Sequence, residues 1–286
     1  MNRTVLQEKS TLRLAILLLA PICAVNAYAF LWPMVTLAML SFQESHAGGS
    51  LGTNFTWANW AEVLGDPFYR ALVWESVFTS LTITFLALVC SYPIALYLHR
   101  ASGRWKSFLL VLVVAPLLTS AVVRTYGWIA ILSDQGLIAT SLRAMGMAEV
   151  PLMMFNKFGV VVGLTEILMP YMILSLLVGF GKLEGRFEEA AATLGASPAR
   201  VFWHVILPIS APGIALGSML CFVITVSAFI TPKLLGGGRV FLLATEIYDQ
   251  AIVTLNWPVG AALSIETLIL FGIALAIYSR LTRKLG

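Results

Sequence analysis

The chain has 286 residues, of which 59% are hydrophobic and only 11% are charged, and its formal net charge is +4. A soluble domain carries roughly 25% charged residues, so this composition excludes a water-facing surface over a domain of this size. It predicts a protein whose main solvent is the lipid bilayer. The basic excess then concerns orientation in the membrane, and we expect no nucleic-acid partner.

Six stretches are long and apolar enough to cross a bilayer, which takes about 20 mostly apolar residues. In chain order they are residues 14–42, 72–98, 107–133, 159–181, 212–232 and 259–280. We therefore expect an all-α, polytopic membrane protein with six transmembrane helices. Residues 1–286 are expected to form a single transmembrane domain.

The first stretch also resembles a secretory signal peptide. Arg3, Lys9 and Arg13 precede an apolar core that reaches Ala27-Tyr28-Ala29. The apolar run continues to Phe42, beyond that pattern, which is typical of a span that is kept. We expect an uncleaved first helix.

Lysine and arginine concentrate on one side of the six predicted spans. Cytoplasmic loops carry such an excess, so we expect both termini on the cytoplasmic side. The basic residues on that side are Arg3, Lys9, Arg13, Arg100, Arg104, Lys106, Lys182, Arg186, Arg200, Arg280, Arg283 and Lys284. The segments at about 43–71, 134–158 and 233–258 are then periplasmic.

Each predicted periplasmic segment carries aromatic residues. These include Trp57, Trp60, Phe155, Tyr248 and Trp257. Two interpretations stay open: anchoring at the membrane interface, where such rings are enriched, or a docking surface for an external protein. The glycines at 236–238 lack the Lys-Ser/Thr of a phosphate loop and predict a tight turn.

The predicted cytoplasmic loop at about 182–209 has helix signals in order. Residues 184–194 favour a short helix, and Gly195 permits a left-handed ending. Ser197 and Pro198 are typical of a second helix start. That helix is expected to run to about Leu207, and Pro208 to end it. Ser210 and Pro212 repeat the start signal at the fifth span.

The same loop carries an ordered pattern. Glu189, Ala190 and Ala191 are followed by Gly195, then by Val205, Leu207 and Pro208. Spacing alone is compatible with an ordinary amphipathic hairpin. The whole pattern resembles the cytoplasmic EAA loop of binding-protein-dependent ABC importer permeases, with Val205 where the pattern usually has Ile.

This resemblance implies the type I ABC importer permease fold and a role for the loop. Glu188, Glu189, Ala190, Ala191, Gly195, Leu207 and Pro208 are the residues implied in coupling to an ATPase. ATP-driven closure of two ATPases would draw two such loops together and turn the helices from inward- to outward-facing.

Three further segments resemble the spermidine/putrescine-type permease branch. They are residues 122–128, 235–238 and 256–262. The branch implies a second related permease chain, more often different than identical, two ATPase subunits and a periplasmic solute-binding protein, in the bacterial inner membrane. This chain has no Walker motif, so we expect it to be no enzyme and to bind no cofactor; ATP and Mg would lie on the ATPase. The implied solute is a polyamine or related organic cation, and members importing opines, aminophosphonates or other small solutes leave alternatives open.

Ionisable residues inside spans are costly and mark candidate pathway positions. Glu166 and Glu266 could line a passage for a cation, with Tyr171, Tyr126 and Trp128 offering cation–π faces. A polar contact between helices, or an ion pair with Arg124, is the alternative for both carboxylates. For Arg124 itself we favour a structural role, in which its guanidinium orders the outer gate.

Other function classes lack residues in suitable patterns. The cysteines Cys23, Cys90 and Cys221 lie in apolar runs and are expected to be packing residues. His46, His99 and His204 are not paired at ligand spacing, so neither a metal site nor a catalytic site is expected. A secondary transporter or channel would explain the spans and the intramembrane acids, but it leaves the ordered loop without a purpose.

Overall fold

The computed structural model describes residues 3–46, 49–147 and 149–283, so Lys284, assigned above to the cytoplasmic side, lies outside the described residues. Its helices are α1 Arg3–Leu40, α2 Ala58–Gly65, α3 Pro67–Arg100, α4 Gly103–Val114, α5 Ala121–Leu132, α6 Leu137–Ala144, α7 Lys157–Gly179, α8 Gly185–Thr193, α9 Pro198–Val201, α10 Leu207–Val226, α11 Ile230–Leu235, α12 Leu243–Tyr248 and α13 Trp257–Arg283. Short 3₁₀ segments occupy Ala115–Leu118 and Phe180–Lys182, and π-helical turns occupy Phe202–Ile206 and Asp249–Val253. The strands are β1 Gln43–Ser45 and β2 Leu51–Phe55.

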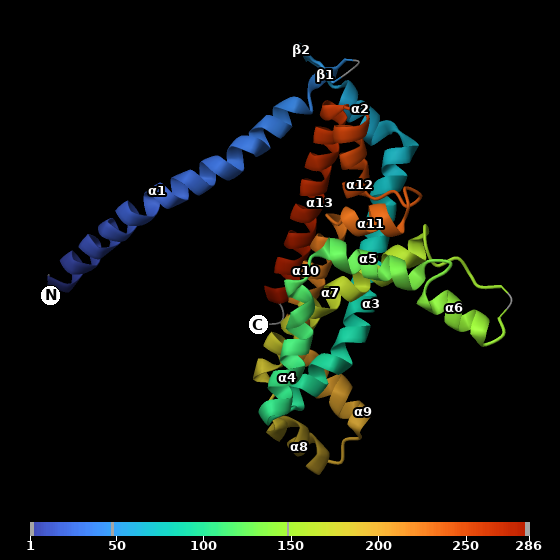
Figure 1. Ribbon diagram of the computed structural model, residues 1–286. Coiled ribbons are helices and arrows are strands. Elements are labelled where there is room, and N and C mark those ends of the chain that lie inside the picture. Colours follow the sequence, from blue (N-terminus) through green and yellow to red (C-terminus); the bar gives the residue numbers. More distant parts are fainter. Residues whose placement is uncertain (1–2, 47–48, 148, 284–286) are drawn as a thin grey trace.

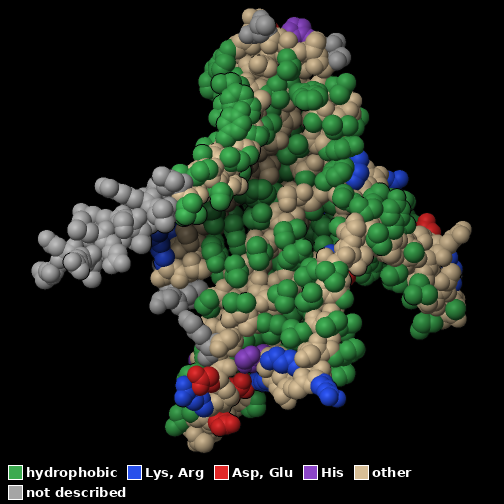
Figure 2. Space-filling view, turned by 60° about the vertical axis from the view of Figure 1, so that its left-hand side comes forward, with side chains coloured by type: hydrophobic (Ala, Val, Ile, Leu, Met, Phe, Trp, Pro, Cys, Tyr) green, Lys and Arg blue, Asp and Glu red, His purple; other side chains and the backbone are tan. Residues whose placement is uncertain are grey.

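The molecule is an elongated helical bundle built on α3, α7, α10 and α13 (Figure 1). One end carries α8 and α9 and is here called the loop end. The opposite end carries β1 and β2 and is called the hairpin end. Hydrophobic side chains cover the middle of the surface in Figure 2, whereas charged side chains gather at the loop end and on a protruding arm. This distribution suits a chain whose middle lies in lipid.

Five of the six predicted spans are continuous helices of sufficient length. They lie at Leu18–Leu40, Pro67–Arg100, Lys157–Gly179, Pro198–Val226 and Trp257–Arg280. The first projects away from the bundle, and none of its apolar window is buried in this chain (Figure 1). The helix contacts α13, but an apolar surface that its own chain leaves uncovered needs lipid or another chain to cover it.

The third predicted span, 107–133, is wrong as a continuous helix. The chain bends by 98° between Gly103–Leu118 and Ala121–Ala144, so six spans result only if this bent pair counts as one. Pro116 lacks an N–H and sits in the 3₁₀ turn that closes the first half. Ser120 then caps α5 by accepting from the N–H of Val122 at 3.3 Å, which starts a new helix in a new direction.

The fifth span differs at both ends. Pro208 does not end a helix, because α9, a π-helical turn and α10 run on as one helix from Pro198 to Val226. In the π turn the N–H of Leu207 bonds to Phe202, and such turns take up the irregularity that a proline introduces. The helix stops at Val226 rather than 232, and Pro232 lies in the first turn of the separate helix α11, where a proline is tolerated. Ser210 is buried and caps nothing.

The hairpin end departs from an all-helical plan. β1 and β2 pair antiparallel directly after α1. The amide of Asn59 donates to the carbonyls of Ser41 and Gln43 at 2.9 and 2.8 Å, and the indole of Trp60 donates to the Ser41 hydroxyl at 3.1 Å. Trp57 packs edge-on against Phe42. These aromatic residues therefore fix the end of α1, beyond any contact with the membrane interface.

Small residues let the central helices approach closely. A Cβ on Gly213 of α10 would lie 2.8 Å from the Cα of Gly179 on α7 and 2.7 Å from the Ser175 carbonyl. Such contacts suit membrane helices, which associate by close packing rather than by the hydrophobic effect. The core beside this contact includes fully buried Leu168, Met172, Leu176 and Phe180.

Candidate functional site

The loop between α7 and α10 contains α8, and this helix ends at a glycine in the left-handed conformation. Gly195 has a φ of 79°, as predicted. Its N–H donates to the carbonyl of Ala192 at 2.9 Å, and the N–H of Ala196 reaches the carbonyl of Ala191 at 3.1 Å. This pair of bonds is a Schellman motif, which turns the chain sharply out of α8.

The second helix of the loop starts as predicted. The hydroxyl of Ser197 accepts from the N–H of Arg200 at 3.4 Å, and Pro198 occupies the first helical turn. Because α9 leads without a break into α10, the exposed loop and a membrane-spanning helix are mechanically continuous.

The predicted ATPase-contacting residues divide into three groups. Glu189, Ala190 and Gly195 are exposed, and Ala191 is half-buried against the core. Glu188 is engaged within the chain, since its carboxylate accepts from Arg100 Nη2 at 2.6 Å. Leu207 and Pro208 lie away from the loop face and line an apolar groove.

Several large apolar side chains of this loop are exposed. Leu194, next to the turn, is 88% exposed, and Trp203 and Phe187 are exposed as well. Apolar side chains grouped with small ones on a protruding loop are typical of a surface that another protein covers.

Two of the predicted pathway residues form an ion pair, and a third donates a hydrogen bond to it. Arg124 Nη1 on α5 lies 3.6 Å from Glu166 Oε1 on α7, and the indole of Trp128 donates to Glu166 Oε2 at 3.3 Å. The Arg124 side chain is 12% exposed and that of Glu166 is 35% exposed. The carboxylate therefore has a cation and a hydrogen-bond donor within the chain, which corresponds to the ion-pair alternative.

The other pathway candidates do not join this pair. Among the described residues, no hydrogen bond or ion pair links Tyr126, Tyr171 or Glu266 to Arg124 or Glu166. Tyr126 and Tyr171 are exposed on helix surfaces. Glu266 lies on α13, and its buried Oε2 has no hydrogen-bond partner in the described part of the chain.

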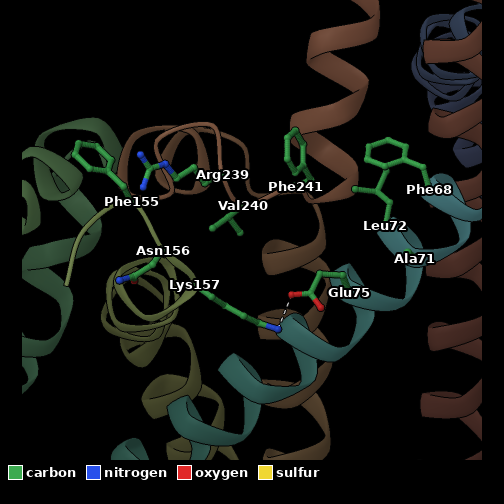
Figure 3. Close-up of a pocket in the computed structure, with 10 residues that line it drawn as sticks. All are labelled: Phe68, Ala71, Leu72, Glu75, Phe155, Asn156, Lys157, Arg239, Val240 and Phe241. Atoms are coloured by element: carbon green, nitrogen blue, oxygen red, sulfur yellow. Dashed lines mark ion pairs between the residues drawn. The ribbon is translucent and has the colours of Figure 1, made fainter. Parts of the chain in front are cut away.

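A pocket near the hairpin end was not predicted. It has a volume of about 530 Å³ and lies between α3, the start of α7 and the segment before α12 (Figure 3). Lys157 Nζ lies 2.5 Å from Glu75 Oε1 across it, while Arg239, Phe68 and Phe241 line its rim. The sequence signal for this pocket was Glu75, an acidic residue inside a predicted span. Its partner Lys157 is 82 positions away in sequence, so the pair could not be predicted.

An apolar groove of about 890 Å³ lies between α3, α10 and α13. Leu81, Ala215 and Leu270 are typical of its lining. Cys221 is buried as expected, but Cys23 and Cys90 are exposed on helix surfaces rather than packed. Within the described ranges, no three His, Cys, Asp or Glu side chains meet in a group that could hold a metal ion.

Comparison with known proteins identifies relatives along most of the chain. A family model described as binding-protein-dependent transport system inner membrane component matches residues 83–286. The spermidine/putrescine transport system permease protein PotB of Haemophilus influenzae is 34% identical over 224 residues, which are 78% of each chain. PotB of Escherichia coli is 34% identical over 233 residues, 81% of this chain and 84% of that protein.

The fold also matches a solved importer. A bacterial ABC transporter involved in the import of the acidic polysaccharide alginate contains a chain that superposes with a TM-score of 0.72. The match covers 99% of both chains at 15% sequence identity. At this identity the likeness concerns the fold alone.

Proposed function

The chain belongs to the family of binding-protein-dependent transport system inner membrane components, and on that premise we propose that it is the permease subunit of an ATP-driven ABC importer in the bacterial inner membrane. Its loop end faces the cytoplasm with both termini, and its hairpin end faces the periplasm. The observation that carries the proposal is the loop itself: Glu189, Ala190 and Gly195 are exposed on a hydrogen-bonded turn that leads into a long apolar helix.

The partners follow from this role. Two ATPase subunits bind the loops and carry the ATP and Mg, a second related permease chain completes the membrane part, and a periplasmic solute-binding protein delivers the solute. The chain itself is non-catalytic and binds no cofactor. The uncovered apolar surface of α1 and the exposed Leu194 and Trp203 support contacts with further chains.

The proposed solute is a polyamine such as spermidine or putrescine. The names and identity of the PotB relatives support this class. A second solute class, such as an opine or an aminophosphonate, is favoured by one observation: Arg124 compensates the charge of Glu166. A compensated carboxylate offers less to a passing cation than a free one.

The test is uptake of labelled spermidine and putrescine into proteoliposomes that contain the native partner chains and binding protein. We expect uptake that requires ATP inside the vesicles. Uptake without ATP, driven by an ion gradient, would identify a secondary transporter instead. Solute-stimulated ATP hydrolysis with another solute, but none with polyamines, would keep the importer and replace the solute.

Gly195→Asp tests the loop. Nothing lies within 4 Å of a Cβ at this position, although the left-handed backbone strains any side chain here, and the substitution brings a charged side chain into the proposed ATPase contact. We expect uptake and ATPase association to fall at least about tenfold, as for a charge buried in an interface. Gly103→Asp is the matched control, because Gly103 is also left-handed and open but lies outside this loop. Normal uptake by the Gly195 variant would disprove the role of the loop.

A further inference from the structure

We propose that α3 is a second transmission element, which connects the ATPase-binding loop to the hairpin-end segment around α12, and that Tyr92, His99 and Arg100 are its positioning residues. The inference rests on the proposed function of the loop. It adds a route beyond the continuous α9–α10 helix, and it runs through a helix of 34 residues, about 51 Å long.

The last turns of α3 contact the first half of the loop, which contains α8. Arg100 Nη2 donates to Glu188 of α8 at 2.6 Å. Just before α8, the carbonyl of Leu183 accepts from His99 Nε2 at 3.0 Å. The His99 ring also lies against Phe180, with centroids 5.6 Å apart. These contacts lie on consecutive residues of α3, and they connect the end of this helix to α8 and to Leu183 just before it.

The same end of α3 also contacts the second half of the loop, which leads from α9 into α10. Tyr92 packs edge-on between Phe180 and Phe202, at 5.5 Å from each ring. Its hydroxyl lies 2.9 Å from that of Ser210 on α10. Because Ser210 donates its single hydrogen to the Leu207 carbonyl, Tyr92 is the donor of this bond. The α3 end is therefore fixed to both sides of the loop.

The other end of α3 is fixed to the hairpin-end segment. The N–H of Leu243, the first residue of α12, donates to the Ser76 hydroxyl at 2.9 Å. The amide of Gln250 donates to the Tyr69 hydroxyl at 3.2 Å. Glu75 pairs with Lys157 at the start of α7 (Figure 3). A rigid helix attached at both ends transfers displacement between them, since packed elements shift as units.

The test uses the complete transporter in proteoliposomes and the double variant Tyr92→Phe/Arg100→Gln. The phenyl ring keeps the packing against Phe180 and Phe202 while one hydrogen bond and one ion pair are removed. Each such contact shifts an equilibrium a few-fold, so we expect the solute moved per ATP to fall about tenfold. ATPase association and the rate of ATP hydrolysis are expected to stay within about twofold.

Arg104→Gln is the matched control, because Arg104 is an exposed arginine near Arg100 that makes no ion pair among the described residues. Wild-type uptake per ATP in the double variant would overturn the proposal. So would loss of ATPase association, which would show that these residues act on docking.

A second readout follows the hairpin end directly. Phe241, which is exposed and lies just before α12, is replaced by cysteine in a background without the three native cysteines. With α3 as the link, trapping of the ATPases with ATP and vanadate changes the rate of maleimide labelling at this position, and the change disappears in the double variant. An unchanged response in the double variant would overturn the proposal even if Gly195→Asp behaves as expected.

Discussion

The Arg124–Glu166 pair bears on whether polar residues inside the bundle stabilise it or bind the solute. Arg124 is nearly buried, and its Nε has no hydrogen-bond partner in the described part of the chain. Among the described residues, the anion that compensates its charge is Glu166, at 3.6 Å. Removing one partner of a buried pair leaves an uncompensated charge, which costs more than removing both.

We therefore predict that Glu166→Gln lowers the stability of the assembled transporter and that Arg124→Gln added to it restores part of the loss. A fully buried pair loses about 3–5 kcal/mol when broken; Glu166 is partly exposed, so we expect about 1–2 kcal/mol. Thermal unfolding of the purified complex in nanodiscs measures this. The KM for spermidine is expected to change less than about threefold. A tenfold rise in KM, unaffected by the second substitution, would instead assign Glu166 to cation binding.

Helix packing depends on the contact between α7 and α10, where Gly179 and Gly213 face each other. At Gly213 the obstacles are backbone atoms, which cannot turn aside as a flexible side chain can. We predict that Gly213→Ala destabilises the chain by about 1–3 kcal/mol, the usual cost of overpacking. Expression level and thermal unfolding in detergent are the measurements.

Gly272→Ala on α13 is the matched substitution. Nothing lies within 4 Å of a Cβ there, and alanine favours a helix by up to about 1 kcal/mol over glycine. It is expected to be neutral or stabilising. Equal effects of the two substitutions would mean that the α7–α10 contact does not limit stability.

The elements show how far a sequence pattern can predict such a bundle. Length and apolarity predict five spans, because each is long enough to cross a bilayer. Prolines do not predict the breaks. Pro93 and Pro170 lie inside continuous helices, whereas Pro116 and Pro232 lie at or beside breaks. In membrane helices neighbouring groups can satisfy the freed carbonyl, and that depends on packing that the local sequence does not contain.

The loop shows the opposite case. Gly195, Ser197 and Pro198 act through local backbone bonds, so their spacing was sufficient to predict the turn. The partners of Glu75 and Glu188 were not predictable, since Lys157 and Arg100 lie 82 and 88 positions away. The assignment of the coupling and pathway residues to their roles stays a prediction until the variants are measured.

At the scale of the whole molecule, the orientation across the membrane sets what every surface contacts. Basic residues favour the loop end as the cytoplasmic side. We predict that a membrane-impermeant maleimide added outside spheroplasts labels cysteine at Phe55, which is 68% exposed at the hairpin end, but not cysteine at Leu194, which is 88% exposed at the loop end. Both variants are made without Cys23, Cys90 and Cys221, and permeabilised cells are the control in which both positions react. Labelling of Leu194→Cys in intact spheroplasts would place the loop outside, where no ATPase could reach it, and would end the importer proposal.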